Sequence, residues 1–291
     1  MNANSPLETY LAAFKAYGEI QDCWDDPGWA QSVRAQLSVL EKSFRDLLNV
    51  AESTDPAIWH AIGTGFRSGL GTKRDRAEAI RWFQRAAEAG HAPAMLSLGS
   101  CLQRPEPSID PAGAIQWFCK AAESGHAPAM VSLGFTYRDG TGVPSDYTEA
   151  LRWFMKAVAA GDSHSMTHVG RVYAHYLSSP KEAVTWFLRA AQAVQGDSFL
   201  ELARLYDNRD LDVYNPAEAH KWFRVAAEHS EGRSTNALFA IARQYIEGVG
   251  AQCDLEMAKW WLNRILLVAP EKSASRRQAS QMLKKIESQF L

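Results

Sequence analysis

The sequence lacks long apolar segments and has no strong excess of charge of either sign. No stretch of about 18 consecutive apolar residues occurs among its 291 residues, so no membrane-spanning helix is predicted. Residues 1–16 have neither a basic start nor a continuous apolar stretch, so no secretory signal is expected. The formal net charge of −2 creates no field that would attract nucleic acid or an anionic membrane. We therefore expect a cytoplasmic protein that binds neither nucleic acid nor membrane.

Cysteine is sparse and scattered. Cys23, Cys101, Cys119 and Cys253 form no Cys-x-x-Cys pair, so neither a zinc site nor a disulfide framework is predicted. Because structural disulfides belong to oxidising compartments, a reducing compartment is the simplest interpretation.

Motifs that carry catalysis or hold cofactors are also missing. No serine or cysteine stands in a Gly-x-Ser-x-Gly elbow or another nucleophile motif. Gly63-Thr64-Gly65 lies in a helical pattern, and it is followed by Gly69 and not by the third glycine of a dinucleotide fingerprint. We therefore predict no cofactor and no enzymatic activity.

What the sequence does contain is a repeat of 33–39 residues. Six tryptophans stand in nearly the same context, in segments such as AIRWFQRAAEAGH and AIQWFCKAAESGH: Trp82, Trp117, Trp153, Trp186, Trp222 and Trp261. A small residue lies 16–19 positions before each of them: Gly63, Gly99, Gly134, Gly170, Ala203 and Ala242. Two markers that keep step through six units indicate tandem repeats.

Each unit is predicted to form two helices, A and B. In helix A, apolar residues stand four before, one before and three after the small residue, which marks one helical face. The small residue should let a neighbouring helix approach closely, and the tryptophans of helix B should fill the core. Gly-x-Gly segments at 69–71, 140–142 and 248–250 supply turns that need positive φ. Seven residues before each tryptophan stands a favoured helix N-cap: Asp75, Asp110, Asp146, Ser179, Asn215 and Asp254.

These motifs resemble the Sel-like repeat family, relatives of the tetratricopeptide repeats, over residues 57–267. The resemblance implies an all-α fold, a right-handed α/α superhelical solenoid of about six two-helix repeats that acts as an adaptor. Some bacterial members resemble immunity proteins that neutralise a toxin, and others are scaffolds for envelope or signalling assemblies.

The ends of the chain are predicted to cap the array, because a solenoid must cover its open core. We divide the chain into an N-terminal helical cap (1–55), a repeat array (56–268) and a C-terminal capping helix (269–291). Leu7, Leu11, Phe14 and Tyr17 form one apolar stripe in the N-terminal cap. A second stripe has coiled-coil spacing, which leaves a dimer seam open beside the cap: Val33, Leu37, Leu40, Phe44 and Leu47.

A partner is predicted to bind on the side of the A helices that faces away from the packed stripe. In tetratricopeptide-like arrays that side lines the concave groove. It carries one arginine per repeat and a few aromatic residues: Arg67, Arg104, Phe135, Arg138, Arg171, His175, Arg204, Phe239 and Arg243. Arginine pairs bidentately with carboxylates, so this ladder would suit an acidic or C-terminal segment. The alternative is that these are ordinary surface arginines.

One cluster could instead serve chemistry. His164 and His168 are spaced i, i+4, with His175 seven residues further on, so they could bind a metal on one helix face. No HExxH glutamate accompanies them. The preferred hypothesis remains a non-catalytic protein-binding module, with a toxin-neutralising immunity protein as one form and a metal-binding or enzymatic protein as the alternative.

Overall fold

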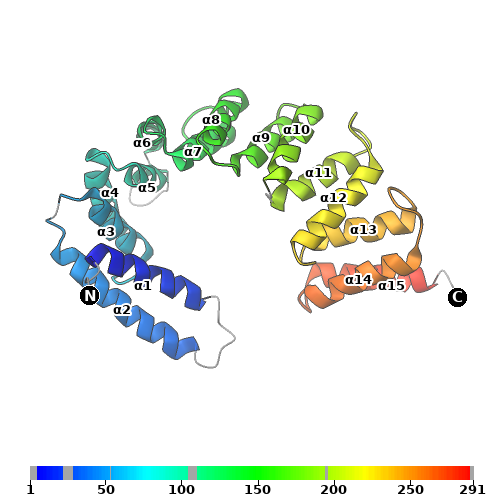
Figure 1. Cartoon of the computed structure of the whole chain (residues 1–291), viewed down its shortest axis with the longest axis horizontal. Coiled ribbons are helices and arrows are strands. Elements are labelled where there is room, and N and C mark those ends of the chain that lie inside the picture. Colours follow the sequence, from blue (N-terminus) through cyan, green and yellow to red (C-terminus); the bar gives the residue numbers. More distant parts are fainter. Residues whose placement is uncertain (1–4, 22–28, 53, 104–109, 194–195, 289–291) are drawn as a thin grey trace. The chain divides into compact units, whose positions relative to one another are not determined.

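The computed structural model describes residues 5–21, 29–52, 54–103, 110–193 and 196–288, and every regular element in these ranges is an α-helix (Figure 1). The first eight helices are α1 (Pro6–Gln21), α2 (Trp29–Asn49), α3 (Pro56–Ser68), α4 (Arg76–Glu88), α5 (Ala92–Leu102), α6 (Pro111–Glu123), α7 (Ala127–Asp139) and α8 (Tyr147–Ala159). They are followed by α9 (Ser165–His175), α10 (Pro180–Gln192), α11 (Gly196–Asp207), α12 (Pro216–His229), α13 (Thr235–Glu247), α14 (Leu255–Val268) and α15 (Ala274–Ser288).

The chain forms two compact units, Met1–Trp153 and Phe154–Leu291, a division inside α8 that the sequence did not predict. In the first unit, each helix from α3 to α7 packs on the next in chain order. In the second unit, the same holds from α9 to α15. This succession of helix pairs confirms the predicted all-α solenoid architecture of about six repeats with helical caps.

The N-terminal helices form a cap on α3. Tyr10, Leu40, Phe44 and Leu47 are buried in one cluster with Ile62 of α3. Most of the second apolar stripe is thereby covered within the chain, which confirms the cap interpretation for that part. The hydroxyl of Tyr10 donates to the carbonyl of Leu70 (3.3 Å), and burial raises the pKa of Tyr10 to about 12. At the other end, α15 closes the second unit and buries Ala279 and Ile286 against the α13–α14 core.

A phenylalanine, and not the tryptophan before it, fills the core of each repeat. The residue after each of the first five repeat tryptophans is fully buried (0–4% exposed): Phe83, Phe118, Phe154, Phe187 and Phe223. The five tryptophans themselves are only partly buried, so the prediction that they fill the core was wrong. The sixth repeat differs, because Trp261 is buried and Leu262 takes the phenylalanine position.

The small residue of helix A accommodates this phenylalanine ring. A Cβ built on Gly63, Gly99 or Gly170 would lie 2.5–2.6 Å from the phenylalanine ring of its own helix pair. Carbon atoms in contact normally stay about 3.5–4.0 Å apart. The ring therefore lies directly on the backbone of helix A, and glycine permits the two helices to come this close.

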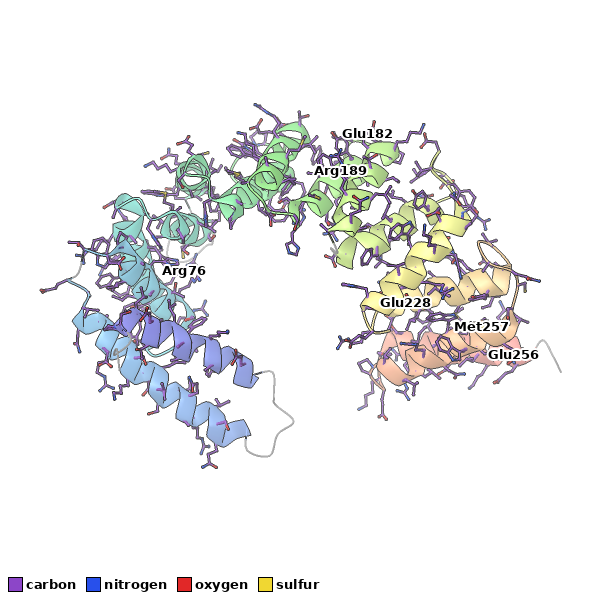
Figure 2. The ribbon with its side chains drawn as sticks, in the orientation of Figure 1. Arg76, Glu182, Arg189, Glu228, Glu256 and Met257 are labelled. Atoms are coloured by element: carbon purple, nitrogen blue, oxygen red, sulfur yellow. The ribbon has the colours of Figure 1, made fainter. Side chains whose placement is uncertain are left out.

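Cations cover several of the half-buried tryptophans. The Lys120 ammonium lies 4.2 Å from the Trp117 ring centre, and the Arg189 guanidinium (labelled in Figure 2) lies 4.8 Å from that of Trp186. Both pairs are spaced i, i+3 on helix B, so they lie on the same helix face. Cation–π attraction at such exposed sites contributes about 0.5–1 kcal/mol. These tryptophans therefore form the border between the core and the surface.

The predicted turn chemistry is largely confirmed. Five of the six predicted caps accept a hydrogen bond from a backbone N–H in the first turn of helix B. Ser179 is the exception, because its hydroxyl donates to the carbonyl of Leu177 (3.2 Å). The Gly-x-Gly turns do adopt positive φ, from 67° to 82°. The second glycine also permits a close approach, since a Cβ on Gly142 would lie 2.2 Å from Pro111 Cβ.

We predict that Gly170→Ala destabilises the second unit by about 1–3 kcal/mol, because the added methyl group overlaps the Phe187 ring. Gly18→Ala in α1 is the control, since nothing lies within 4 Å of its added Cβ and alanine favours a helix. Urea unfolding measures both free energies. Equal stabilities of the two variants would contradict the close ring contact.

Candidate functional site

In the first unit, two of the predicted binding residues lie in one cluster on α7. The guanidinium of Arg138 stacks 4.7 Å from the centre of the Phe135 ring, and its Nε donates to the Asp139 carboxylate (2.6 Å). Arg67 on α3 is exposed and lies 5.5 Å from the Phe83 ring centre. Arg104 lies outside the described residues.

In the second unit, the predicted arginines are paired with carboxylates of α11. Arg171 Nε donates to Glu201 (3.0 Å), and Arg204 lies 4.0 Å from the same carboxylate. Arg243 of α13 donates to Asp207. The second unit therefore neutralises much of the positive charge that the sequence suggested for this face.

The other two predicted residues in the second unit differ in exposure. His175 is exposed at the end of α9. Phe239 is partly buried and packs against the core of α13 and α14, so most of its ring is unavailable as an anchor. The structure thus keeps the predicted ladder at the surface, but mostly as internal ion pairs.

An apolar pocket that the sequence analysis missed opens between α1 and α3. Its volume is about 220 Å³. The lining residues are Leu7, Tyr10, Leu11, Phe14, Ala57, His60, Ala61 and Thr64. Leu11 is 52% exposed, although it belongs to the stripe predicted to pack inside the cap. Leu7, Phe14 and Tyr17 of that stripe are partly buried and pack against the cap core, next to the fully buried Tyr10 and Ala13.

This pocket lies on the predicted binding side of α3. His60 and Thr64 stand three before and one after the small residue Gly63, which are two of the positions predicted to face a partner. The sequence does contain a signal for the pocket, because α1 has more apolar residues than one packed face can cover. Leu11 shares one face with Leu7 and Phe14, while Tyr10 and Ala13 share the other.

A row of histidines stands beside this pocket. The His60 ring lies 5.2 Å from the His91 ring, centre to centre, and its Nε2 is 3.0 Å from the Ser97 hydroxyl. Burial, followed by repulsion from His91 and Arg67, lowers the pKa of His60 to about 4. Burial also lowers the pKa values of His91 and His126. All three therefore favour the neutral form.

The alternative metal cluster does not come together. His164 and His168 line a pocket with Arg171 and Asp197, while His175 is absent from its lining. The His168 ring packs against Phe154 (5.2 Å between ring centres). Among the residues that the structure describes, no group of three or more His, Cys, Asp and Glu side chains could hold a metal ion.

The Sel1 repeat matches the chain at residues 61–91, 92–126, 127–162, 164–193 and 200–230, which together exceed half of its length. The chain belongs to the Sel1 repeat family. A sixth helix pair, formed by α13 and α14, lies beyond the matched residues and packs on the pair before it. No curated protein matches the sequence at a significant level.

Solved structures support the Sel1 repeat fold. A Sel1 repeat protein from Oxalobacter formigenes shares 23% identity and a TM-score of 0.64, over 93% of this chain and 99% of that one. A protective antigen with an SLR fold from uropathogenic Escherichia coli shares 20% identity and a TM-score of 0.54, over 88% and 68%. An immunity protein from Pseudomonas aeruginosa shares 18% identity over 77% and 80%, with a TM-score of only 0.38, too low to carry an argument. None of the described helices is both long and apolar enough to cross a membrane.

Acid should destabilise the first Sel1 repeats through His60. Because the folded pKa lies below the unfolded value of about 6.5, the unfolded chain binds more protons between the two values. Stability is therefore fully present above pH 6.5 and falls as the pH approaches 4, by up to about 3 kcal/mol. Urea unfolding across this range should show a weaker pH dependence for His60→Gln. Parallel profiles for the variant and the unmodified chain would contradict this assignment.

The ion pair of Arg171 should contribute measurably to stability, whereas that of Arg204 should not. Glu201 is only 13% exposed, so Arg171→Ala leaves its carboxylate without its close partner and should cost about 1–2 kcal/mol. Arg204 is 53% exposed and further from the same carboxylate, so Arg204→Ala should cost less than about 0.5 kcal/mol. Urea unfolding measures the stability of both variants. Equal losses of unfolding free energy would contradict the difference predicted between the two ion pairs.

Proposed function

We propose that this chain is a non-catalytic module that binds a segment of another protein on the exposed face of its A helices. The observation that carries the proposal is that packing and surface positions are separate within each repeat. The residues that recur from repeat to repeat, the phenylalanine, the small residue and the alanines, are buried and serve packing. Many residues that differ between repeats, such as Arg67, His175 and Arg204, are exposed on the A helices, and there they are available to recognise a partner.

The apolar pocket between α1 and α3 is the strongest anchor point on this face. Leu11 exposes half of its side chain there, beside the partly buried Leu7 and Phe14. An apolar side chain of a partner could fill this volume and remove the exposed surface from water, at about 25 cal/mol per Å² of apolar area. His60 and Thr64 add polar groups to its lining.

Two outcomes of partner binding fit this module: neutralisation of a toxin, or assembly of a complex. The family resemblance suggests a toxin-neutralising immunity protein as one form and a scaffold as the other. Co-expression with the product of the adjacent gene, followed by a toxicity assay, separates them, since only an immunity protein restores growth. Because the scattered cysteines form no Cys-x-x-Cys pair and suggest no disulfide framework, a cytoplasmic location is part of this proposal.

The test uses the full chain as bait for proteins of its native organism. Leu11→Glu puts a charge into the apolar pocket and should reduce recovery of the specific partner about tenfold or more. Leu267→Glu is the matched control, because Leu267 is an 84% exposed leucine outside that pocket, and it should retain the partner. Circular dichroism checks that both variants remain helical. Partner recovery that is the same for both variants would remove the pocket from the proposed interface.

A further inference from the structure

A second pocket, lined by three arginines, lies on the next turn of α3. It is formed by the end of α3, the following loop, the start of α4 and the second half of α5, and its volume is about 260 Å³. The lining residues are Arg67, Ser68, Arg74, Arg76, Ser100 and Cys101. None of the carboxylates in the described part of the chain lines it. We call it the arginine pocket.

Arg76 is held in place by the backbone of α5. It is the first residue of α4 (labelled in Figure 2), and its Nη2 donates to the carbonyl of Cys101 near the C-terminal end of α5. Carbonyls in the last turn of a helix have no partner within the helix and carry partial negative charge, so a guanidinium is stabilised there. Arg76 is therefore oriented before any ligand arrives.

The positive charge in the arginine pocket is not balanced from within the described part of the chain. No ion pair among the described residues involves Arg67, Arg74 or Arg76. The nearest carboxylate in sequence, Asp75, does not line the pocket: it accepts the backbone N–H of Glu78 and caps α4. Three cationic side chains at one site repel one another unless an anion lies between them.

The second unit contains a pocket in the equivalent position, and there the chain supplies the anion itself. Arg67 stands four residues after the small residue Gly63, and Asp207 stands four residues after the small residue Ala203. Asp207 accepts hydrogen bonds from Arg243 and Gln244, and this pocket is about 330 Å³ in volume. Where the second unit has a carboxylate, the arginine pocket has a third cation.

We propose that the arginine pocket binds a carboxylate from an acidic segment of the partner protein, in the role that Asp207 fills inside the second unit. Planar guanidinium groups suit a carboxylate because two parallel N–H bonds can form at once. Thr64 of the apolar pocket precedes Arg67 by one helical turn, about 5 Å along α3. The partner segment therefore carries an acidic and an apolar side chain that reach adjacent sites. This inference rests on the proposed function.

The test measures binding of a fluorescent hexaglutamate peptide to the full chain by anisotropy at low ionic strength. The unmodified chain should bind it, and Arg67→Gln/Arg74→Gln should bind about tenfold more weakly or worse. Arg76 is left intact because it also holds α5. Arg209→Gln is the matched control, since Arg209 is an exposed arginine of the equivalent pocket and lies 3.9 Å from Glu247. It should bind like the unmodified chain.

Four outcomes would overturn the inference. They are absence of binding to the unmodified chain, unchanged affinity of the double variant, an equal loss in Arg209→Gln, and displacement of the peptide by inorganic phosphate at equal concentration. Glu106→Gln is a further control, since this carboxylate lies outside the described residues. The affinity of this variant for the peptide should equal that of the unmodified chain. A tenfold gain would show that Glu106 of this chain already occupies the arginine pocket, and it would overturn the inference.

The partner assay separates this inference from the proposed function. If the double variant loses the peptide but retains the partner found with Leu11, the inference fails and the proposed function stands. If the peptide binds through the arginines while no partner depends on Leu11, the anion pocket stands and the proposed function fails.

Discussion

The contact between a buried phenylalanine and the backbone of helix A determines most of this structure. The ring of Phe83, Phe118 or Phe187 lies where a side chain would begin on the facing glycine, so the two helices of a repeat pack at close range. Each helix pair has an apolar face that it cannot cover alone, and the next pair covers it. Because the packing is supplied by local pairs, the surface positions between them can change without loss of the fold.

This separation of packing from surface explains how one architecture holds two different charge arrangements. In the second unit, arginines of the A helices pair with Glu201, Asp197 and Asp207 of the chain itself. In the first unit, Arg67, Arg74 and Arg76 line a pocket to which no carboxylate of the described residues contributes. The repeat geometry is the same, so the difference lies in single residues such as Arg67 and Asp207, which stand at matching positions. A repeat protein can in this way keep one unit closed and leave another open to a partner.

The cap also has two roles in the structure. Tyr10, Leu40 and Phe44 cover the end of the core and keep α3 from exposing its apolar face. The same helix α1 turns Leu11 outward beside α3 and forms the apolar pocket. The cap thus extends the A-helix surface, and the neutral histidines beside it keep that part of the surface free of additional charge near neutral pH.

The sequence alone determined the elements that depend on local chemistry. Helix boundaries follow from N-cap residues such as Asp75 and from Gly-x-Gly turns, because these act within a few residues of chain, and the repeat period predicted the succession of helix pairs. The sequence did not reveal that Phe83 and not Trp82 fills the core, since both are large aromatic residues, adjacent in the chain, and the close fit against Gly63 distinguishes them. Nor did it reveal which arginines are paired. Arg171 and Glu201 are 30 residues apart, and Arg67 and Arg76 line one pocket from the two sides of a loop, so tertiary packing decided both arrangements.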